Sequence, residues 1–280
     1  MFLAIDIGNT QTVIGYFIHG QLQRQWRVST HPLCTADEFL LKLEGMLSSS
    51  QISLRSIDTI LTSSVVPAFS KMLEAAFRGK RFYRIDWQAP FSFQLAVDTP
   101  QEVGADRLVN AEAAVRHYGF PSIIVDSGTA TTICAVGQTN RGEPVYLGGA
   151  IIPGIELSMQ ALAQKAAQLY SIELTPPKKA IGSNTREALR SGLLLGYACL
   201  IDGMVKRFQK ELHLESAPVI ATGGVSYLMK DLTQSITHFD PDLTLKGIAS
   251  LYGSLGSRSS QSEFNGQENF TRDHGEHRRI

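Results

Sequence analysis

Short hydrophobic runs separated by polar turns dominate the first 30 positions of the chain. Residues 2–7 are almost entirely hydrophobic and predict a short buried strand. A second strand is predicted over residues 12–18. The His19-Gly20 pair is typical of a tight hairpin turn and leads into a third strand over residues 21–29. The chain is therefore expected to begin with three consecutive strands.

A helical spacing of hydrophobic residues follows these strands. Over residues 36–47 they recur three and four positions apart, which predicts an amphipathic helix. Strands are predicted near residues 57–62 and 82–85, on either side of a helix that begins at Pro67, since proline suits the first turn of a helix. This alternation of strands and helices predicts an α/β fold.

The segment over residues 122–136 repeats the pattern of the N-terminus at an offset of 120 residues. The Asp-x-Gly sequence at residues 6–8 aligns with the one at residues 126–128, and Thr12 aligns with Thr132. This offset is too long for a solenoid repeat but suits two lobes descended from one unit. Because the polar turn recurs along with the hydrophobic run, we predict two similar lobes.

The rest of the second half also alternates between strands and helices. The predicted elements are a helix over Asp106–His117, a strand over 144–152, helices from Ile155 and Arg186, a strand over 218–221 and a helix from Val225. We expect the first lobe to cover residues 1–118 and the second to cover residues 119–255. Residues 256–280 contain few large hydrophobic side chains and are expected to form a disordered tail.

Composition and charge restrict the function only broadly. The 280 residues include 26 Lys plus Arg and 26 Asp plus Glu, so we expect neither nucleic acid nor a membrane as a partner. The longest hydrophobic stretch, residues 193–201, is interrupted by Gly196 and is shorter than the roughly 20 residues of a membrane span. The first residues lack the basic start of a signal peptide. With three cysteines and no Cys-x-x-Cys motif, we expect a cytoplasmic protein with reduced thiols.

The Asp-x-Gly turns have the composition of phosphate-binding turns. Gly8 lets a ligand approach the main chain, and Asn9 and Thr10 add hydrogen-bond donors. Asp6, at the end of a buried strand, is suited to hold Mg²⁺ directly or through water beside nucleotide phosphates. The alternative is an ordinary hairpin turn capped by its own aspartate. The recurrence of the turn, with a further glycine pair at residues 223–224, favours phosphate binding.

A different candidate lies at residues 104–107, Gly-Ala-Asp-Arg, where a helix is expected to begin. An acidic residue in the first turn of a helix is favoured by the helix dipole for structural reasons alone. The functional interpretation is that Asp106 accepts a proton from a substrate hydroxyl group. Arg107 would then bind a substrate carboxylate or stabilise charge.

Small residues also form a seam along one predicted helix, at Gly192, Gly196, Cys199 and Gly203. Such a seam lets a second helix approach closely. Core packing and a subunit interface are both compatible with this pattern. The sequence contains no P-loop, dinucleotide fingerprint, nucleophile elbow or zinc-binding helix motif.

Six motifs in this order resemble the type III pantothenate kinases, within the superfamily that includes acetate kinase, sugar kinases and actin. They are Asp6-Ile-Gly-Asn-Thr10, Gly104-Ala-Asp-Arg107, Asp126-Ser-Gly-Thr129, Gly148-Gly-Ala-Ile-Ile-Pro-Gly154, Gly182-Ser-Asn-Thr185 and Thr222-Gly-Gly224. The resemblance covers residues 1–255. It implies two actin-like (ribonuclease H-like) lobes with a nucleotide cleft between them. It also implies ATP-dependent phosphorylation of pantothenate, the first step of coenzyme A biosynthesis.

The resemblance also implies roles for individual residues. The expected ATP-binding residues are Asp6, Ile7, Gly8, Asn9, Thr10, Gln11, Thr12, Val13 and Thr129. Asp106 would be the general base on the pantothenate hydroxyl group, and the expected pantothenate-binding residues are Gly104, Ala105, Asp106, Arg107, Thr185 and Val97. Asp6 would serve Mg²⁺, and Asp126 would help bind a monovalent cation, K⁺ or NH₄⁺. Family members form homodimers.

Val97 departs from the family pattern, which commonly has a tyrosine in contact with pantothenate at this position. Two alternative functions remain open from the sequence. The chain could phosphorylate another small hydroxylated metabolite, or it could be an ATP-binding regulatory protein of the same fold without turnover. The three aspartates favour an enzyme, because a protein that only binds ATP has no need of the Asp106 carboxylate.

Overall fold

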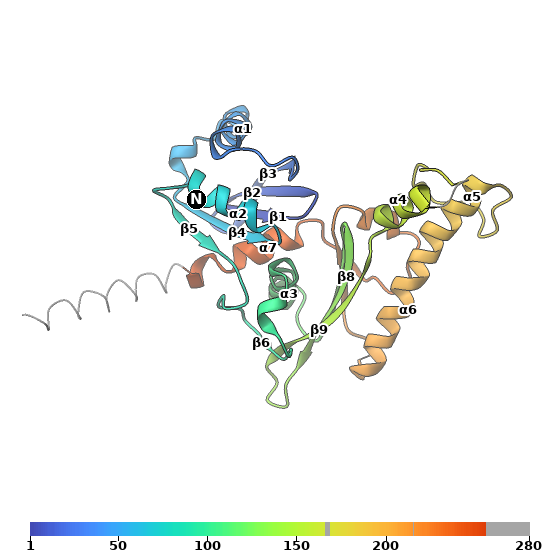
Figure 1. Cartoon of the computed structure of the whole chain (residues 1–280). Coiled ribbons are helices and arrows are strands. Elements are labelled where there is room, and N and C mark those ends of the chain that lie inside the picture. Colours follow the sequence, from blue (N-terminus) through green and yellow to red (C-terminus); the bar gives the residue numbers. More distant parts are fainter. Residues whose placement is uncertain (166–168, 215, 256–280) are drawn as a thin grey trace, which may run out of the picture.

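The computed structural model describes residues 1–165, 169–214 and 216–255. The predicted tail, residues 256–280, lies outside the described residues. Two β-sheets, of five and six strands, form the centres of two lobes that lie side by side (Figure 1). The predicted α/β fold with two similar lobes is confirmed.

The first sheet consists of β1 (Phe2–Ile7), β2 (Gln11–Ile18), β3 (Gln21–Ser29), β4 (Thr59–Ser64) and β5 (Arg81–Arg84). Their order in the sheet is β3-β2-β1-β4-β5, with β1 antiparallel to β2 and parallel to β4. All five strands were predicted. β4 begins two residues later than expected, because Ile57 closes a 3₁₀ turn over Leu54–Ser56.

The second sheet consists of β6 (Gln94–Leu95), β7 (Ser122–Ser127), β8 (Ala130–Gln138), β9 (Pro144–Pro153), β10 (Val219–Thr222) and β11 (His238–Phe239). Their order is β11-β10-β7-β8-β9-β6. The run β9-β8-β7-β10-β11 therefore reproduces the first sheet, and β7 is likewise antiparallel to β8 and parallel to β10. The predicted repeat is confirmed, and β6 is an additional edge strand.

The alignment of the repeat shifts by one residue after the turn. Ile7 pairs with Thr12, whereas the equivalent Ser127 pairs with Thr131. The predicted match of Thr12 with Thr132 is therefore wrong. The second turn is one residue shorter than the first, and Thr131 occupies the position of Thr12. Both threonine side chains are completely buried.

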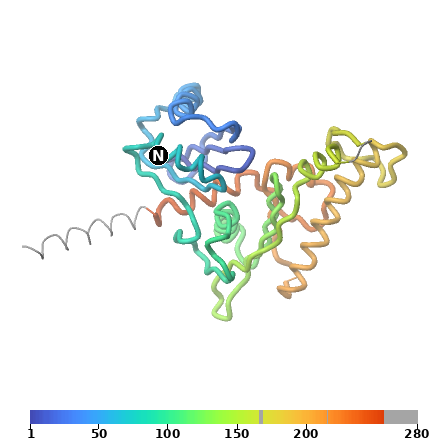
Figure 2. The backbone as a smooth tube through the Cα atoms, viewed as in Figure 1, coloured from blue at the N-terminus to red at the C-terminus, as the bar shows by residue number. Residues whose placement is uncertain are grey.

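The helices of the described residues are α1 (Ala36–Ser49), α2 (Pro67–Ala76), α3 (Ala105–His117), α4 (Ile155–Lys165), α5 (Thr185–Arg190), α6 (Gly196–Glu211) and α7 (Leu243–Ser250). α1 and α2 share a hydrophobic core with one face of the first sheet, and α4 and α6 share one with the second sheet. α3 and α7 pack between the two sheets and against each other. Figure 2 shows the C-terminal segment, in orange and red, returning from the second lobe to the first.

Three features differ from the sequence prediction. The helix expected from Val225 is a single 3₁₀ turn over Ser226–Met229. α7 was not predicted, although its contacts reach β1, β2 and β4 of the first sheet. β6 and β11 were not predicted either, because a two-residue strand is too short to produce a recognisable pattern.

The contact between α3 and α7 depends on a glycine. A Cβ atom on Gly247 of α7 would collide with the carbonyl oxygen of Val109 in α3. Val109 and the neighbouring Ile248 are completely buried, so neither helix has free space into which it can move. Gly247 therefore permits the close approach of the two helices that join the lobes.

We expect Gly247→Ala to lower the free energy of unfolding by at least about 2 kcal/mol, because the added methyl group forces buried helices apart. Gly45→Ala is the matched control. Gly45 lies inside α1 with no atom within 4 Å of a Cβ placed there, so the same change should stabilise the protein by about 0.5–1 kcal/mol. Urea unfolding of both variants measures the two changes in the free energy of unfolding. If both substitutions changed it in the same direction, the proposed contact would be contradicted.

Candidate active site

The two Asp-x-Gly turns meet where the lobes face each other. The hydroxyl oxygens of Thr10 and Thr129 are 2.8 Å apart, although these residues are separated by 119 positions in the sequence. In each turn the glycine N–H closes the turn, from Gly8 to the Gln11 carbonyl at 3.0 Å and from Gly128 to the Ala130 carbonyl at 3.1 Å. The structure therefore brings together the two predicted phosphate turns.

A buried threonine that the sequence analysis missed supports the first turn. Thr30, directly after β3, donates its hydroxyl hydrogen to the Gly8 carbonyl at 2.8 Å and its N–H to the Thr10 carbonyl at 2.9 Å. The Thr12 hydroxyl lies 3.0 Å from the Thr30 hydroxyl. No pattern in the sequence marks Thr30, because its partners lie 18 to 22 residues away.

Two glycines support the second turn from outside the repeat. Gly154, directly after β9, donates its N–H to the Thr129 carbonyl at 3.1 Å, and a Cβ atom there would collide with the Gly128 carbonyl. A Cβ atom on Gly223 would lie 2.5 Å from Asp126 Oδ1. Gly154 and Gly223 thus have one physical explanation. They let the backbone pack directly against the Asp126 turn.

Three carboxylates gather around the junction of the turns. Asp6 and Asp126 are the second-last residues of β1 and β7, and Asp106 lies in the first turn of α3. Burial, followed by repulsion from Asp106 and Asp126, raises the pKa of Asp6 to about 8. Burial and the charge of Asp106 raise the pKa of Asp126 to about 6. Each of these two side chains keeps a small exposed surface, so they remain accessible to a ligand.

Asn110 is a further site residue that the sequence analysis missed. It lies one turn after Asp106 on α3, is completely buried, and donates from Nδ2 to Asp126 Oδ2 at 2.8 Å. Its carbonyl oxygen, Oδ1, is buried without a hydrogen-bond partner among the described residues. An unpaired buried oxygen next to a carboxylate is a suitable ligand pair for a hard cation. The oxygens of Asp126 and Asn110 are therefore candidate ligands for a cation.

The Gly-Ala-Asp-Arg motif begins α3 with Gly104 as its N-cap. A Cβ atom at Gly104 would collide with the Asp106 carboxylate, so glycine lets this side chain keep its position. The Arg107 N–H donates to Asp106 Oδ1 at 2.9 Å. Burial raises the pKa of Asp106, and the charge and N–H of Arg107 offset part of this effect. Ala105 is buried, whereas Gly104, Asp106 and Arg107 are partly exposed.

Two further predicted substrate-binding residues lie outside the α3 motif. Val97 follows β6 and lies 3.5 Å from where a Cβ atom of Gly148 would be, at the edge of the second sheet. Thr185 is exposed at the start of α5. Figure 1 places α5 at the outer end of the second lobe, away from α3. The structure of one chain therefore does not bring Thr185 to the other predicted site residues.

The two lobes, which repeat one order of five strands, define an actin-like fold. The fold matches that of a Campylobacter jejuni protein assigned to the Baf family of transcriptional activators, with a TM-score of 0.59 and 19% identity over 91% of this chain and 100% of that one. It also matches (R)-2-hydroxyglutaryl-CoA dehydratase component A from Acidaminococcus fermentans, with a TM-score of 0.53 and 12% identity over 90% and 96% of the two chains. At these identities the likeness concerns the fold alone.

Sequence relatives then identify the family. The family model for type III pantothenate kinase matches residues 2–207. A type III pantothenate kinase from Rubrobacter xylanophilus is 42% identical over 92% of this chain and 100% of its own length. One from Roseiflexus castenholzii is 43% identical over 90% of this chain and 98% of its own. The chain belongs to the type III pantothenate kinase family.

In buffer without metal ions or nucleotide, we expect stability to fall as the pH rises from about 5 to about 9. The folded-state pKa values of Asp6 and Asp126 lie above the value near 4 of an unfolded chain. The folded protein therefore holds protons that the unfolded chain has released, and a rising pH favours unfolding until the folded pKa is passed. The decrease in melting temperature over this pH range, measured by thermal unfolding, should be smaller for Asp6→Asn than for wild type. Asp58→Asn, at an exposed position, should behave like wild type.

Proposed function

We propose that the chain transfers the γ-phosphoryl group of ATP to the hydroxyl group of pantothenate, as its family name indicates, with Asp106 as the general base. The observation that carries this proposal is the gathering of Asp6, Asp106 and Asp126 at the junction of the two turns, where each carboxylate has a raised pKa. Phosphoryl transfer requires little more of a protein than positioning and neutralisation of charge. The two turns would position the phosphates, and Arg107 together with cations held by the carboxylates would neutralise their charge.

The phosphates of ATP lie between the two turns in this proposal. Residues 6–13 supply the first turn and Thr129 belongs to the second. Asn9, Thr10 and Thr129 are exposed and carry hydrogen-bond donors, whereas the Gly8 N–H is already used inside its turn. Asp6 is the one carboxylate on the first turn, which suits Mg²⁺, since this ion is commonly held by one or two carboxylates plus nucleotide phosphates. Mg²⁺ bound there neutralises charge on the transferred group.

Asp106 accepts the proton of the attacking hydroxyl group. The raised pKa of Asp106 is closer to the working pH, which makes its carboxylate a stronger base toward the substrate hydroxyl group. Gly104 and Ala105 set the position of the carboxylate at the helix N-terminus. Arg107 is partly exposed next to it and suits the carboxylate of pantothenate. Val97 replaces the family tyrosine with a hydrophobic contact.

Asp126 and Asn110 hold the monovalent cation, K⁺ or NH₄⁺, in this proposal. The amide oxygen of Asn110 supplies the second oxygen, and its N–H group keeps Asp126 in place. The cation offsets the repulsion between Asp126 and Asp106, which costs stability in the ion-free protein. Among the described residues no group of three or more His, Cys, Asp or Glu side chains is arranged to hold a metal, so main-chain and ligand oxygens would complete the site.

We expect Asp106→Asn to lower the pantothenate-dependent release of ADP by a factor of about 10² to 10⁴, because the amide cannot accept the proton. A coupled ADP assay with and without K⁺ measures this rate. Asp58→Asn is the control for loss of a carboxylate elsewhere. Equal rates for wild type and Asp106→Asn would exclude the general base, and ADP release without need of pantothenate would favour another acceptor or a regulatory protein.

We also propose a homodimer, because the long apolar helix has an uncovered face. No atom lies within 4 Å of a Cβ placed on Gly192, Gly196 or Gly203, which excludes packing of this seam inside the described chain. By length and hydropathy, the helical stretch Thr185–Glu211 resembles a membrane span or the core helix of a folded protein. Only 33% of its most hydrophobic 18-residue segment is buried in the described chain, so it is not covered as a core helix would be. A second copy that covers this face would explain both facts. It would also bring a second α5, with Thr185, toward the site of its partner.

This arrangement predicts complementation between two inactive variants. Asp106→Asn removes the base of its own site, and Thr185→Tyr would block the site of the partner. Mixed dimers contain one site with both wild-type residues, so co-expression should give activity clearly above that of either variant alone. Light scattering checks that both variants remain dimers. Absence of recovery in proven mixed dimers would mean that Asp106 and Thr185 do not form a shared site.

The proposed location is the cytoplasm, where ATP and K⁺ are both abundant.

A further inference from the structure

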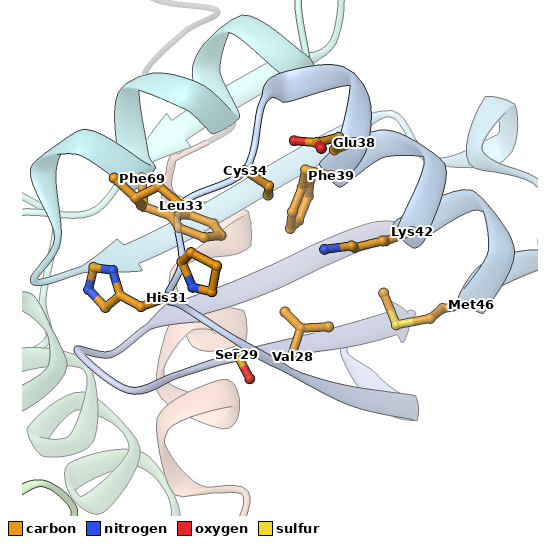
Figure 3. Close-up of a pocket in the computed structure, with 11 residues that line it drawn as sticks. Val28, Ser29, His31, Leu33, Cys34, Glu38, Phe39, Lys42, Met46 and Phe69 are labelled. Atoms are coloured by element: carbon orange, nitrogen blue, oxygen red, sulfur yellow. The ribbon is translucent and has the colours of Figure 1, made fainter.

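A cavity of about 420 Å³ lies in the first lobe, between the end of β3, the loop before α1, and helices α1 and α2 (Figure 3). Most of its walls are hydrophobic. The lining residues are Val28, Ser29, His31, Pro32, Leu33, Cys34, Glu38, Phe39, Lys42, Met46 and Phe69. None of them belongs to the proposed catalytic site, so the cavity requires a separate explanation.

The two charged side chains of the cavity, Glu38 and Lys42, differ in their hydrogen bonding. Glu38 Oε2 accepts the N–H and the hydroxyl of Thr35, at 2.8 Å and 3.0 Å, in the capping box of α1, so this carboxylate is already paired. Lys42 lies one turn further along α1, where its positive charge contributes to lowering the pKa of Glu38, and its ammonium group forms no salt bridge within the described chain. Figure 3 shows the Lys42 nitrogen directed toward the middle of the cavity, with the His31 ring on the opposite side.

We propose that this cavity binds a small amphipathic acid, with its carboxylate or phosphate on Lys42 and its apolar part against Phe39, Met46 and Phe69. The hydrophobic walls favour an apolar body, because removing their surface from water is favourable. The Lys42 ammonium group, directed into the cavity, favours an anionic head group over a cationic one. Cavities of a few hundred Å³ with apolar walls and a few polar groups are typical small-molecule sites.

Occupancy of the cavity is linked to the first phosphate turn through Thr30. The cavity wall contains the residues on both sides of Thr30, namely Ser29 and His31. Thr30 itself holds the Gly8 and Thr10 carbonyls of the turn. A ligand that fixes residues 28–34 therefore changes the affinity of the turn for phosphate. This consequence rests on the proposed role of residues 6–13, whereas the binding site itself does not.

Protection of Cys34 from alkylation tests the site directly. Cys34 lines the cavity and is partly exposed, Cys199 is exposed on α6, and Cys134 is buried, which raises the pKa of its thiol to about 11. With octanoate or octyl phosphate as the probe, the alkylation rate of Cys34 measured by mass spectrometry should fall at least about fivefold. Because Cys199 lies on the α6 seam that the proposed partner covers, the accessible control is a cysteine introduced outside the cavity by Lys71→Cys, whose alkylation rate should not change. The stronger of the two probes identifies the preferred head group.

The charge requirement is tested with two lysine variants. Lys42→Met should abolish the protection by either acid and Lys71→Met, at an exposed position on α2 outside the cavity, should leave it unchanged. Octylamine should give no protection. Unchanged alkylation of Cys34 at saturating probe, or equal protection by octylamine, would overturn the proposal. None of these measurements requires turnover, so their failure is distinct from failure of the kinase activity. ATP titration with and without octanoate then measures the link to the phosphate turn.

Discussion

The close contact of α3 and α7 at Gly247 sets the arrangement on which the site depends. Each helix follows the last strand of one copy of the repeated unit, and both lie between the two sheets. α3 also carries Asp106 in its first turn and Asn110 in its second. The packing that joins the lobes therefore also positions the proposed base beside the carboxylates at the ends of β1 and β7. A change in the distance between the helices would move Asp106 relative to both phosphate turns.

The carboxylates of the site repel one another, and a bound cation would reduce this repulsion. Three carboxylates are held close together in a poorly solvated place, and two of them have pKa values raised to about 8 and about 6. Such crowding lowers the stability of the ion-free protein above the pKa values of unfolded aspartates. A cation that binds only the folded state recovers this free energy. The same repulsion that is unfavourable for folding therefore favours binding of metal ions with ATP.

The parts of the fold that local sequence determines could be predicted, and those that depend on distant contacts could not. The strands, the repeat and the Asp6, Asp106 and Asp126 positions follow from hydrophobic patterns and glycine turns. Thr30 and Asn110 act through partners 16 to 22 residues away, so no local pattern marks them. The one-residue shift of the repeat needs the strand register, which sequence alone does not give. Thr185 was grouped with the site by family resemblance, and only the fold shows that it lies on a distant helix.

The two lobes share one strand order but support their phosphate turns in physically different ways. Thr30 and Gly154 are equivalent, since each follows the third strand of its lobe and donates its N–H to the turn, at 2.9 Å and 3.1 Å. Thr30 adds a hydroxyl group that binds the Gly8 carbonyl, whereas any side chain on Gly154 would collide with the second turn. The second turn is thus held by rigid backbone packing. The first is held by a side chain next to a loop that borders a cavity, so a ligand in that cavity would act on the first turn.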